Sequence, residues 1–407
     1  MSHLNYLEKL LDGVDVEWTT LGNEHAVEIA NSGRKPVKAA LRVAGETPYY
    51  GANNIQDYVD GYTHAGEFVL IAEDGSASVE NYSIQYATGR FWANNHVHVV
   101  RGKEGLNTRY LYHYLCIVNF VPFLSGGGRA KLTKGKLVDI PLPIPCPDNP
   151  EKSLAIQSEI VRILDKFTAL TAELTAELNM RKKQYNYYRD QLLSFEEGDF
   201  EWMTLGDVTK KWYSGGTPTA GKPEFYEGGN IPWLRTQEVK FSDVSETEVF
   251  ITPAALENSS AKWIPENCVI IAISGATAGR TAINKIPLTT NQHCGCLEID
   301  DKKALYRYVF HWVSFNYENI KALGQGARGD LNSTIIKNFR LPVPYANDPE
   351  KSLAEQARIV AILDKFDTLT TSLQEGLPRE IELRQKQYEY YRDLLLNFPK
   401  SHSNEVA

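Results

Sequence analysis

Two near-identical segments recur along the chain, and this internal repeat constrains the fold more than any other feature of the sequence. Residues 151–167 return as residues 350–366, a shift of 199 positions, and residues 181–195 return as residues 384–398, a shift of 203 positions. Repeated segments usually form equivalent structural units. The 407 residues are therefore predicted to follow the order variable segment, shared segment, variable segment, shared segment.

The shared segments have the period of a coiled-coil helix. Apolar residues alternate in steps of four and three through the first copy, and the same seam runs through the second copy until Gly376 and Pro378, which are expected to break or kink the helix. The two copies could pair as antiparallel helices within one chain, or each could pair with a second chain in a homodimer. We favour the intramolecular pair because both partners are already present in one chain. The seam consists of Ile160, Leu164, Phe167, Thr171, Leu174, Leu178, Arg181, Tyr185, Tyr188 and Leu192 in the first copy and of Ile359, Leu363, Phe366, Thr370 and Leu373 in the second, where it resumes at Ile381, Tyr388 and Leu395.

The variable segments are predicted to be mixed α/β domains. Both open on a similar phrase, EWTTLG at residues 17–22 and EWMTLG at residues 201–206. Both are rich in short β-branched or aromatic runs bounded by Gly, Asn or Asp, such as residues 66–72 and 268–273. Runs of this kind are typical of strands in a twisted sheet.

The whole chain is accordingly predicted to be an α+β protein with a pseudo-two-fold repeat and a circular organisation. Residues 6–11 support the circular organisation because they resemble residues 188–193, at the end of the first shared helix. Two mixed α/β domains would be joined by two long antiparallel coiled-coil helices. The expected boundaries are 1–145 for the first domain with its N-terminal partial helix, 146–197 for the first spacer helix, 198–345 for the second domain, 346–400 for the second spacer helix and 401–407 for a disordered tail.

The sequence contains no recognisable catalytic set. The Asn-Pro-Pro-Tyr kind of tetrapeptide that DNA amine methyltransferases need is absent, and a phosphate-loop-like run from Gly216 fails at Pro223, where a hydroxyl group is required. Glu238 and Lys240 have the spacing of some metal-dependent nucleases, but we interpret them as a solvated strand edge. Residues 293–296 (HCGC) lack a second cluster that would complete a zinc shell. We therefore expect no catalytic residue, no metal and no cofactor in this chain.

The sequence also predicts a cytoplasmic protein. Its longest apolar run, residues 268–273, is far shorter than the roughly 20 residues that span a bilayer. The N-terminus lacks the basic start and apolar segment of a signal peptide. The five cysteines lack the paired spacing of a zinc site and are expected to be reduced structural thiols.

The residues that remain for function are hydrogen-bonding and aromatic side chains beside glycines in the variable segments. Asn, Gln, Arg and Ser are the side chains that read base edges, and glycine-rich loops allow the backbone to approach phosphates. A single loop of this kind is more often a plain turn, but an arginine recurs at equivalent positions in both halves. The predicted DNA-binding residues are Tyr49, Tyr50, Asn53, Asn54, Ser76, Asn94, Asn95, His96, Arg129 and Lys131 in the first half and Thr217, Trp233, Arg235, Thr236, Thr277, Arg280, Asn291, Gln292 and Arg328 in the second.

The formal net charge of −8 counts against a protein that coats DNA non-specifically, because that mode of binding depends on Lys and Arg neutralising phosphates. Two explanations remain compatible with DNA binding. Basic residues could gather on one face, or partner subunits could supply the positive wall of a DNA channel.

The arrangement of two different halves separated by two near-identical helices resembles the specificity subunits of Type I restriction-modification systems. The phrases that carry the resemblance are EIVRILDKF, RKKQYNYYRDQLL, RIVAILDKF and RQKQYEYYRD in the helices, and SGGTP, NIPWLRTQEV and GATAGRTAI in the second half. The first half, with TPYYGANNIQDYVDGY and FWANNHVHV, resembles another variant of the same recognition domain. The likeness covers essentially the whole chain.

The resemblance implies a non-catalytic DNA-binding subunit whose two target-recognition domains each read one half of a bipartite double-stranded DNA target. It further implies that the helices set the spacing and that two methyltransferase subunits and, for cleavage, restriction and translocase subunits bind this chain. S-adenosylmethionine, ATP and Mg would belong to those partners.

Two competing hypotheses come from other classes of protein. The chain could be a non-catalytic scaffold with a coiled-coil stem and two binding heads, and a neighbouring gene for a methyltransferase would argue against that. A nuclease that acts alone would require a metal-dependent active site, which the sequence does not contain.

Overall fold

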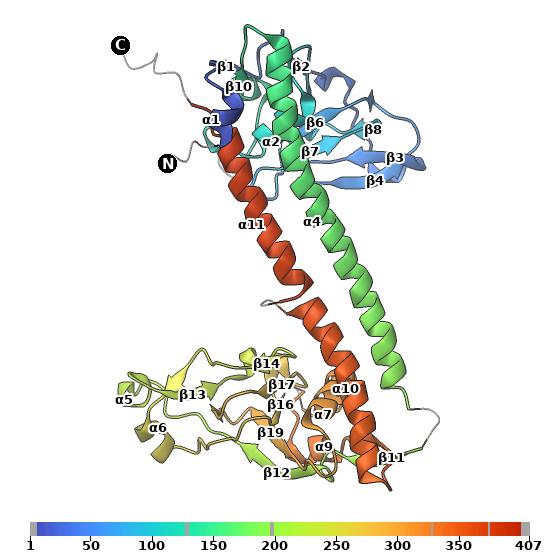
Figure 1. Cartoon of the computed structure of the whole chain (residues 1–407), viewed down its shortest axis with the longest axis vertical. Coiled ribbons are helices and arrows are strands. Elements are labelled where there is room, and N and C mark those ends of the chain that lie inside the picture. Colours follow the sequence, from blue (N-terminus) through green and yellow to red (C-terminus); the bar gives the residue numbers. More distant parts are fainter. Residues whose placement is uncertain (1–5, 127–129, 196–198, 327–328, 373–374, 400–407) are drawn as a thin grey trace. The chain divides into compact units, whose positions relative to one another are not determined.

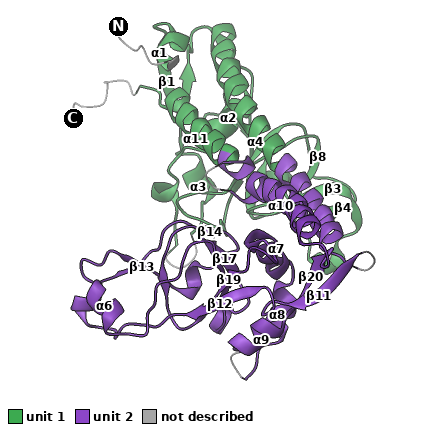
Figure 2. Ribbon diagram, turned by 60° about the horizontal axis from the view of Figure 1, so that its bottom comes forward, with its two compact units in different colours: residues 1–175, 380–407 green, residues 176–379 purple. Residues whose placement is uncertain are grey.

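The computed structural model describes residues 6–126, 130–195, 199–326, 329–372 and 375–399. The chain divides into two compact units, one of residues 1–175 and 380–407 and the other of residues 176–379 (Figure 1, Figure 2). The long helix α4 (Pro150–Leu192) contributes its first part to unit 1 and its last part to unit 2. Each unit therefore combines one variable segment with parts of the shared helices.

Unit 1 is a mixed α/β domain, as predicted. One sheet has the strand order β2-β9-β6-β7 and a second has the order β4-β3-β8-β5, while β1 pairs antiparallel with β10. The central strand β6 is buried along its whole length, which explains its continuous apolar sequence FVLIA. The elements are β1 (Val16–Thr20), β2 (Val27–Ile29), β3 (Ala44–Tyr50), β4 (Ile55–Val59), β5 (His64–Ala65), β6 (Phe68–Ala72), β7 (Ile84–Ala87), β8 (Arg90–Ala93), β9 (Val97–Gly102), β10 (Pro141–Pro145), α1 (Tyr6–Leu11), α2 (Thr108–Leu115) and α3 (Lys134–Leu137).

Unit 2 repeats this fold. The order β12-β19-β16-β17-β14 corresponds to the β2-β9-β6-β7 sheet of unit 1, β15-β13-β18 corresponds to the β4-β3-β8-β5 sheet, and β11 pairs with β20 as β1 pairs with β10. The central strand β16 is again fully buried. The elements are β11 (Phe200–Thr204), β12 (Thr209–Ser214), β13 (Ile231–Leu234), β14 (Asp243–Val244), β15 (Phe250–Ile251), β16 (Val269–Ala272), β17 (Thr281–Asn284), β18 (Thr289–Thr290), β19 (Cys294–Ile299), β20 (Arg340–Pro344), α5 (Pro223–Tyr226), α6 (Pro253–Glu257), α7 (Tyr306–Phe315), α8 (Tyr317–Ala322) and α9 (Ser333–Asn338).

The shared segments form helices that pair within the chain. In unit 1 the first part of α4 packs against α11 (Leu377–Leu396), which runs in the opposite direction, and Phe167 stacks on Tyr391 at 5.2 Å between ring centroids (Figure 1). In unit 2 the last part of α4 packs against α10 (Pro349–Thr371) through the equivalent stack of Tyr188 on Phe366 at 5.6 Å. The prediction of an intramolecular antiparallel pair is confirmed.

The predicted break in the second helix is also confirmed. Helix α10 ends at Thr371 and α11 begins at Leu377. Between them Gly376 has φ +87°, a left-handed conformation that favours glycine, and a Cβ at this position would lie 2.4 Å from the carbonyl oxygen of Thr368.

A buried glutamine joins the shared helix to the domain in each unit. In unit 2 Gln356 accepts a hydrogen bond from the backbone N–H of Leu305 at 2.9 Å and donates to the carbonyl of Lys303 at 3.3 Å and to Ser352 Oγ at 3.1 Å. In unit 1 Gln157 makes the corresponding bonds to Asn107, Gly105 and Ser153. Both glutamines are fully buried, so their polar atoms depend on these partners.

A carboxylate about two helical turns further along the shared helix makes a second junction. Asp364 accepts hydrogen bonds from Arg307 Nη2 and from His311 Nε2, both at 2.6 Å. Burial would raise the pKa of Asp364, but the bonds from His311 and Arg307 outweigh burial and hold the pKa below its usual value. Asp165 in unit 1 accepts in the same way from Arg109 Nε at 2.8 Å and from His113 Nε2 at 2.7 Å.

We predict that Gln356→Met destabilises unit 2 while leaving its core volume nearly unchanged. The substitution removes three hydrogen bonds and leaves the buried N–H of Leu305 and carbonyl of Lys303 without their side-chain partner, which costs about 2 to 4 kcal/mol. Urea unfolding, with hydrogen exchange of the α7 amides as the probe of unit 2, should show the lower free energy of unfolding. Gln385→Met, at an exposed position of α11, is the matched control and should be near neutral. Equal stability of the two variants would contradict this role of Gln356.

Candidate nucleic-acid interface

The predicted residues of unit 1 lie at the end of β3 and on neighbouring loops that hydrogen bonds connect to one another. Asn53 donates to the carbonyl of Gly75 and accepts from the N–H of Ala77, each at 2.8 Å. His96 Nδ1 lies 2.6 Å from Asp74 Oδ1, and the N–H of Asn94 donates to the carbonyl of Tyr50. The cluster is completed by Ser125 and Lys131, since Lys131 forms isolated β-bridges with both Asp74 and Ser125.

The predicted residues of unit 2 are connected in the same way. Thr217 donates to Gln292 Oε1 at 2.6 Å, and Ser274 Oγ lies 2.7 Å from His293 Nδ1. The N–H of Asn291 donates to the carbonyl of Leu234, which precedes Arg235 and Thr236. Thr277 and Arg280 lie on the loop that follows Ser274, and the carbonyl of Thr277 accepts from the N–H of Arg280. We call these two sets of loops the unit 1 cluster and the unit 2 cluster.

Four of the predicted residues are buried, and this corrects the role assigned to their side chains. Direct contact was predicted for Tyr49, Asn94, Trp233 and Asn291, which are 1%, 3%, 6% and 9% exposed. A side chain with so little exposed surface supports the loops instead of touching a ligand. Tyr49 accepts at its hydroxyl from the N–H of Val37 at 3.0 Å, and Trp233 Nε1 donates to the carbonyl of Gly216 at 3.1 Å.

The other predicted residues within the described part of the chain keep exposed or half-exposed side chains. Arg129 and Arg328, the pair on which the sequence argument placed most weight, lie outside the described residues. The exposed or half-exposed set consists of Tyr50, Asn53, Asn54, Ser76, Asn95, His96 and Lys131 in unit 1 and of Thr217, Arg235, Thr236, Thr277, Arg280 and Gln292 in unit 2.

The same backbone frame carries both clusters. Asn94 Oδ1 accepts from the N–H of His96 at 2.8 Å, and Asn291 Oδ1 accepts from the N–H of His293 at 3.0 Å. His96 was predicted from the sequence, whereas its counterpart His293 was not. The signal was available as the phrase Asn-x-His, which occurs at residues 94–96 and again at residues 291–293.

Lys131 and Arg34 in unit 1 and Arg235 in unit 2 are paired with carboxylates. Lys131 Nζ lies 3.2 Å from Glu73 Oε1, and Arg34 Nη1 lies 2.6 Å from Glu73 Oε2. Burial would raise the pKa of Glu73, but hydrogen bonds from Arg34 and Lys131 outweigh it and lower the pKa. Arg235 Nη2 lies 2.6 Å from Glu248 Oε2. Phosphates would have to compete with these carboxylates, which disfavours indiscriminate binding to DNA.

The cysteines of the HCGC phrase lie in the interior of unit 2. Cys294 and Cys296 are buried in the core of unit 2, and burial raises the pKa of the Cys294 thiol to about 12. Among the described residues, no group of three His, Cys, Asp or Glu side chains is placed to hold a metal ion. Within the same residues, no helix is long and apolar enough to cross a membrane.

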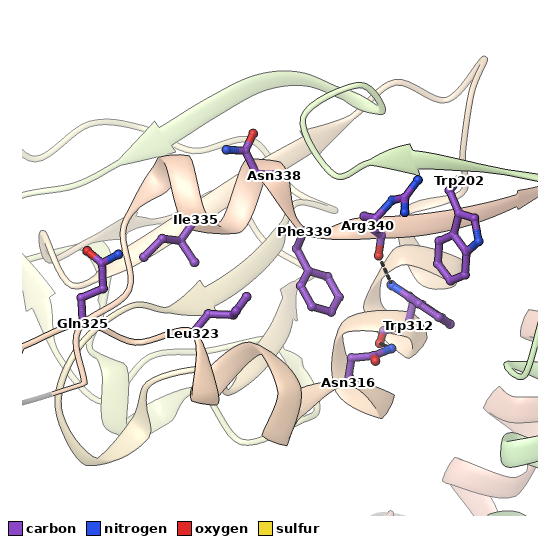
Figure 3. A pocket seen from close by; sticks show the side chains of 9 residues that line it. All are labelled: Trp202, Trp312, Asn316, Leu323, Gln325, Ile335, Asn338, Phe339 and Arg340. Atoms are coloured by element: carbon purple, nitrogen blue, oxygen red, sulfur yellow. Dashed lines mark hydrogen bonds between the residues drawn. The ribbon is translucent and has the colours of Figure 1, made fainter.

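A hollow of about 660 Å³ lies in unit 2 beside the paired strands β11 and β20 (Figure 3). Trp312 Nε1 donates to the carbonyl of Arg340 at 2.8 Å, and the Arg340 guanidinium lies over the Trp202 ring. None of the predicted DNA-binding residues in the described part of the chain lines the hollow. It is lined by Trp202, Trp312, Asn316, Leu323, Gln325, Ile335, Asn338, Phe339 and Arg340.

Comparison with known proteins gives one consistent result. The family model described as the Type I restriction modification DNA specificity domain matches residues 15–181 and again residues 197–383. A protein of Haemophilus influenzae named as a type I restriction enzyme specificity subunit is 46% identical over 97% of this chain and 98% of its own length. The EcoR124I/EcoR124II specificity subunit of Escherichia coli is 42% identical over 98% of each chain. The crystal structure of the S subunit from M. genitalium superposes with a TM-score of 0.65 at 14% identity over 96% of this chain and 97% of that chain, which shows the same fold.

We predict that acidification destabilises unit 1 through His98, which is buried beneath the unit 1 cluster. His98 Nε2 donates to the carbonyl of Leu132 at 2.7 Å, and Nδ1 accepts from Asn31 at 2.9 Å. Burial lowers the pKa of His98, so the unfolded chain takes up a proton that the folded chain refuses. Stability is therefore complete above the unfolded pKa of about 6.5 and falls as the pH drops toward the lower folded pKa.

Hydrogen exchange of β9 at pH 7.5 and pH 5.5 measures this effect. His98→Gln should lower stability at both pH values but should reduce the difference between them. A difference as large in His98→Gln as in the unaltered chain would show that other groups cause the acid sensitivity.

Proposed function

The chain belongs to the specificity subunits of Type I restriction-modification systems, whose role is to recognise DNA sequence, and on that premise we propose that each loop cluster reads one half of a split DNA target. The observation that carries this proposal is the common frame of the two clusters. Both clusters use the same backbone hydrogen bonds, while their exposed side chains differ. Two similar scaffolds with different reading groups would recognise two different short sequences.

The exposed aromatic residues of the helices support two equivalent docking surfaces for partner subunits. Tyr187 in unit 2 is 58% exposed, and Tyr390, which is its counterpart in the repeat, is 63% exposed in unit 1. Exposed tyrosines at equivalent positions are suited to binding the same partner twice. We propose that two methyltransferase subunits bind there and that restriction and translocase subunits join the assembly for cleavage.

The proposed division of labour leaves the chemistry with the partners. S-adenosylmethionine would be bound by the methyltransferase subunits, and ATP and Mg would be bound by the restriction subunits. This chain would contribute the choice of sequence and would act in the cytoplasm, where those subunits meet cellular DNA.

Helix α4 is proposed to set the distance between the two half-sites. It is continuous over 43 residues, and it contains the tandem phrase TAEL at residues 171–174 and 175–178, where the two compact units divide. Four residues are slightly more than one helical turn, so the phrase can be repeated with little change to the buried stripe.

Exchange of one recognition domain tests the reading of half-sites. Replacing residues 18–145 with the corresponding domain of another specificity subunit should change one half of the methylated motif and leave the other half and the spacing intact, because separate domains act nearly independently. Single-molecule sequencing of methylated DNA from cells that express the chimera with its methyltransferase measures the result. Simultaneous change of both halves would refute the modular model.

Insertion of a third TAEL unit after Leu178 tests the spacing. The insertion lengthens α4 by about 6 Å, which corresponds to one or two base pairs, so the gap should grow by that amount while both half-sites stay the same. An inserted TAEL in the exposed 301–303 turn is the control for added length elsewhere. An unchanged gap together with full methylation would eliminate α4 as the ruler.

A further inference from the structure

One loop position is structurally equivalent in the two clusters. Lys131 forms an isolated β-bridge with Ser125, and Asp330 forms one with Gln325. The leucine that follows each of them, Leu132 or Leu331, is buried and donates its N–H to the carbonyl of the residue after the central strand, Glu73 or Ile273, at 2.7 Å in both units. Lys131 and Asp330 therefore occupy the same place in the fold.

These two residues have opposite hydrogen-bonding chemistry. The Lys131 ammonium can only donate, and its side chain is 46% exposed. Asp330 is half-buried and lines a hollow of about 340 Å³ together with Ser274, Gly275 and His293. Lys131 was predicted from the sequence and Asp330 was not, although RAKL at residues 129–132 and RGDL at residues 328–331 are related phrases.

Asp330 also carries an acceptor that the described part of the chain does not satisfy. Its Oδ1 atom is buried and has no hydrogen-bond donor among the described residues. A buried carboxylate oxygen without a donor is unfavourable, and such atoms usually mark a place where a ligand or water supplies the missing bond. The side chains around the hollow are already engaged, because Ser274 Oγ pairs with His293 Nδ1.

We propose that this position is a specificity determinant whose opposite chemistry makes the two half-sites differ. Asp330 accepts from the exocyclic amino group of a cytosine or adenine in the major groove, and Lys131 donates to the O6 and N7 atoms of a guanine. The inference rests on the proposed reading of one half-site by each cluster. It goes further by naming the class of base edge at one position of each half-site.

The test uses the whole chain assembled with its methyltransferase subunits. Methylation rates are measured on duplexes that contain the native target and on duplexes with single base-pair changes in each half-site. Asp330→Ala should slow methylation of the native target about 10-fold, and the isosteric Asp330→Asn should relax the choice at one amino-bearing base of the second half-site. Lys131→Met should relax the choice at one guanine of the first half-site. Asp301→Asn, an equal change of charge in an exposed turn, should leave the rates unaltered.

The outcomes separate this inference from the function on which it rests. If the unaltered complex methylates no bipartite target, the proposed function fails. If the unaltered complex does so and Asp330→Asn retains both rate and base choice, the inference fails. A uniform slowing of all duplexes by Asp330→Ala and Asp330→Asn would also overturn it, because a loop support or phosphate contact does not discriminate between bases. The identity of the native base at the position where the choice is relaxed shows whether Asp330 contacts cytosine or adenine.

Discussion

Each recognition domain depends on one carboxylate of the shared helix. Asp165 and Asp364 accept hydrogen bonds from an arginine and a histidine on the domain's own helix, α2 or α7. Charge-assisted bonds of this kind are directional and stronger than neutral ones, so they fix the orientation of the domain on the helix. With the buried glutamines beside them, they let the loops of each cluster change in sequence while the attachment of the domain stays the same.

The two clusters follow the same principle: the hydrogen-bonded loop backbone is shared by the two units, while the exposed side chains differ. Backbone hydrogen bonds from Asn94 to Tyr50 and from Asn291 to Leu234 connect equivalent loops in the two units, and the buried side chains of Asn94 and Asn291 support these loops. The groups left at the surface can then be replaced without loss of the fold. On the proposed function, the acidic charge of the chain would be compatible with DNA recognition if partner subunits supplied affinity for phosphate while this subunit supplied discrimination.

The helices, the two domains and the break at Gly376 could be predicted from sequence because repetition and hydrophobic period are local signals. The polar loop residues were named from the sequence, but the hydrogen bonds that bring the loops together were not predicted. The burial of Tyr49 and Trp233 was not, because burial depends on tertiary packing that composition does not encode. The Arg-Tyr-x-x-His phrases whose Arg and His bind Asp165 and Asp364 recur at a shift of 198 positions, one fewer than the first helix repeat, and were overlooked for that reason.

The central claim is that this chain alone chooses the DNA sequence that its methyltransferase modifies. The most direct measurement is the map of methylated bases across the host genome, with and without the gene for this chain. We expect a two-part motif with a fixed gap that disappears when the gene is deleted and returns when the chain is supplied from a plasmid. Persistence of the same motif after deletion would contradict the claim.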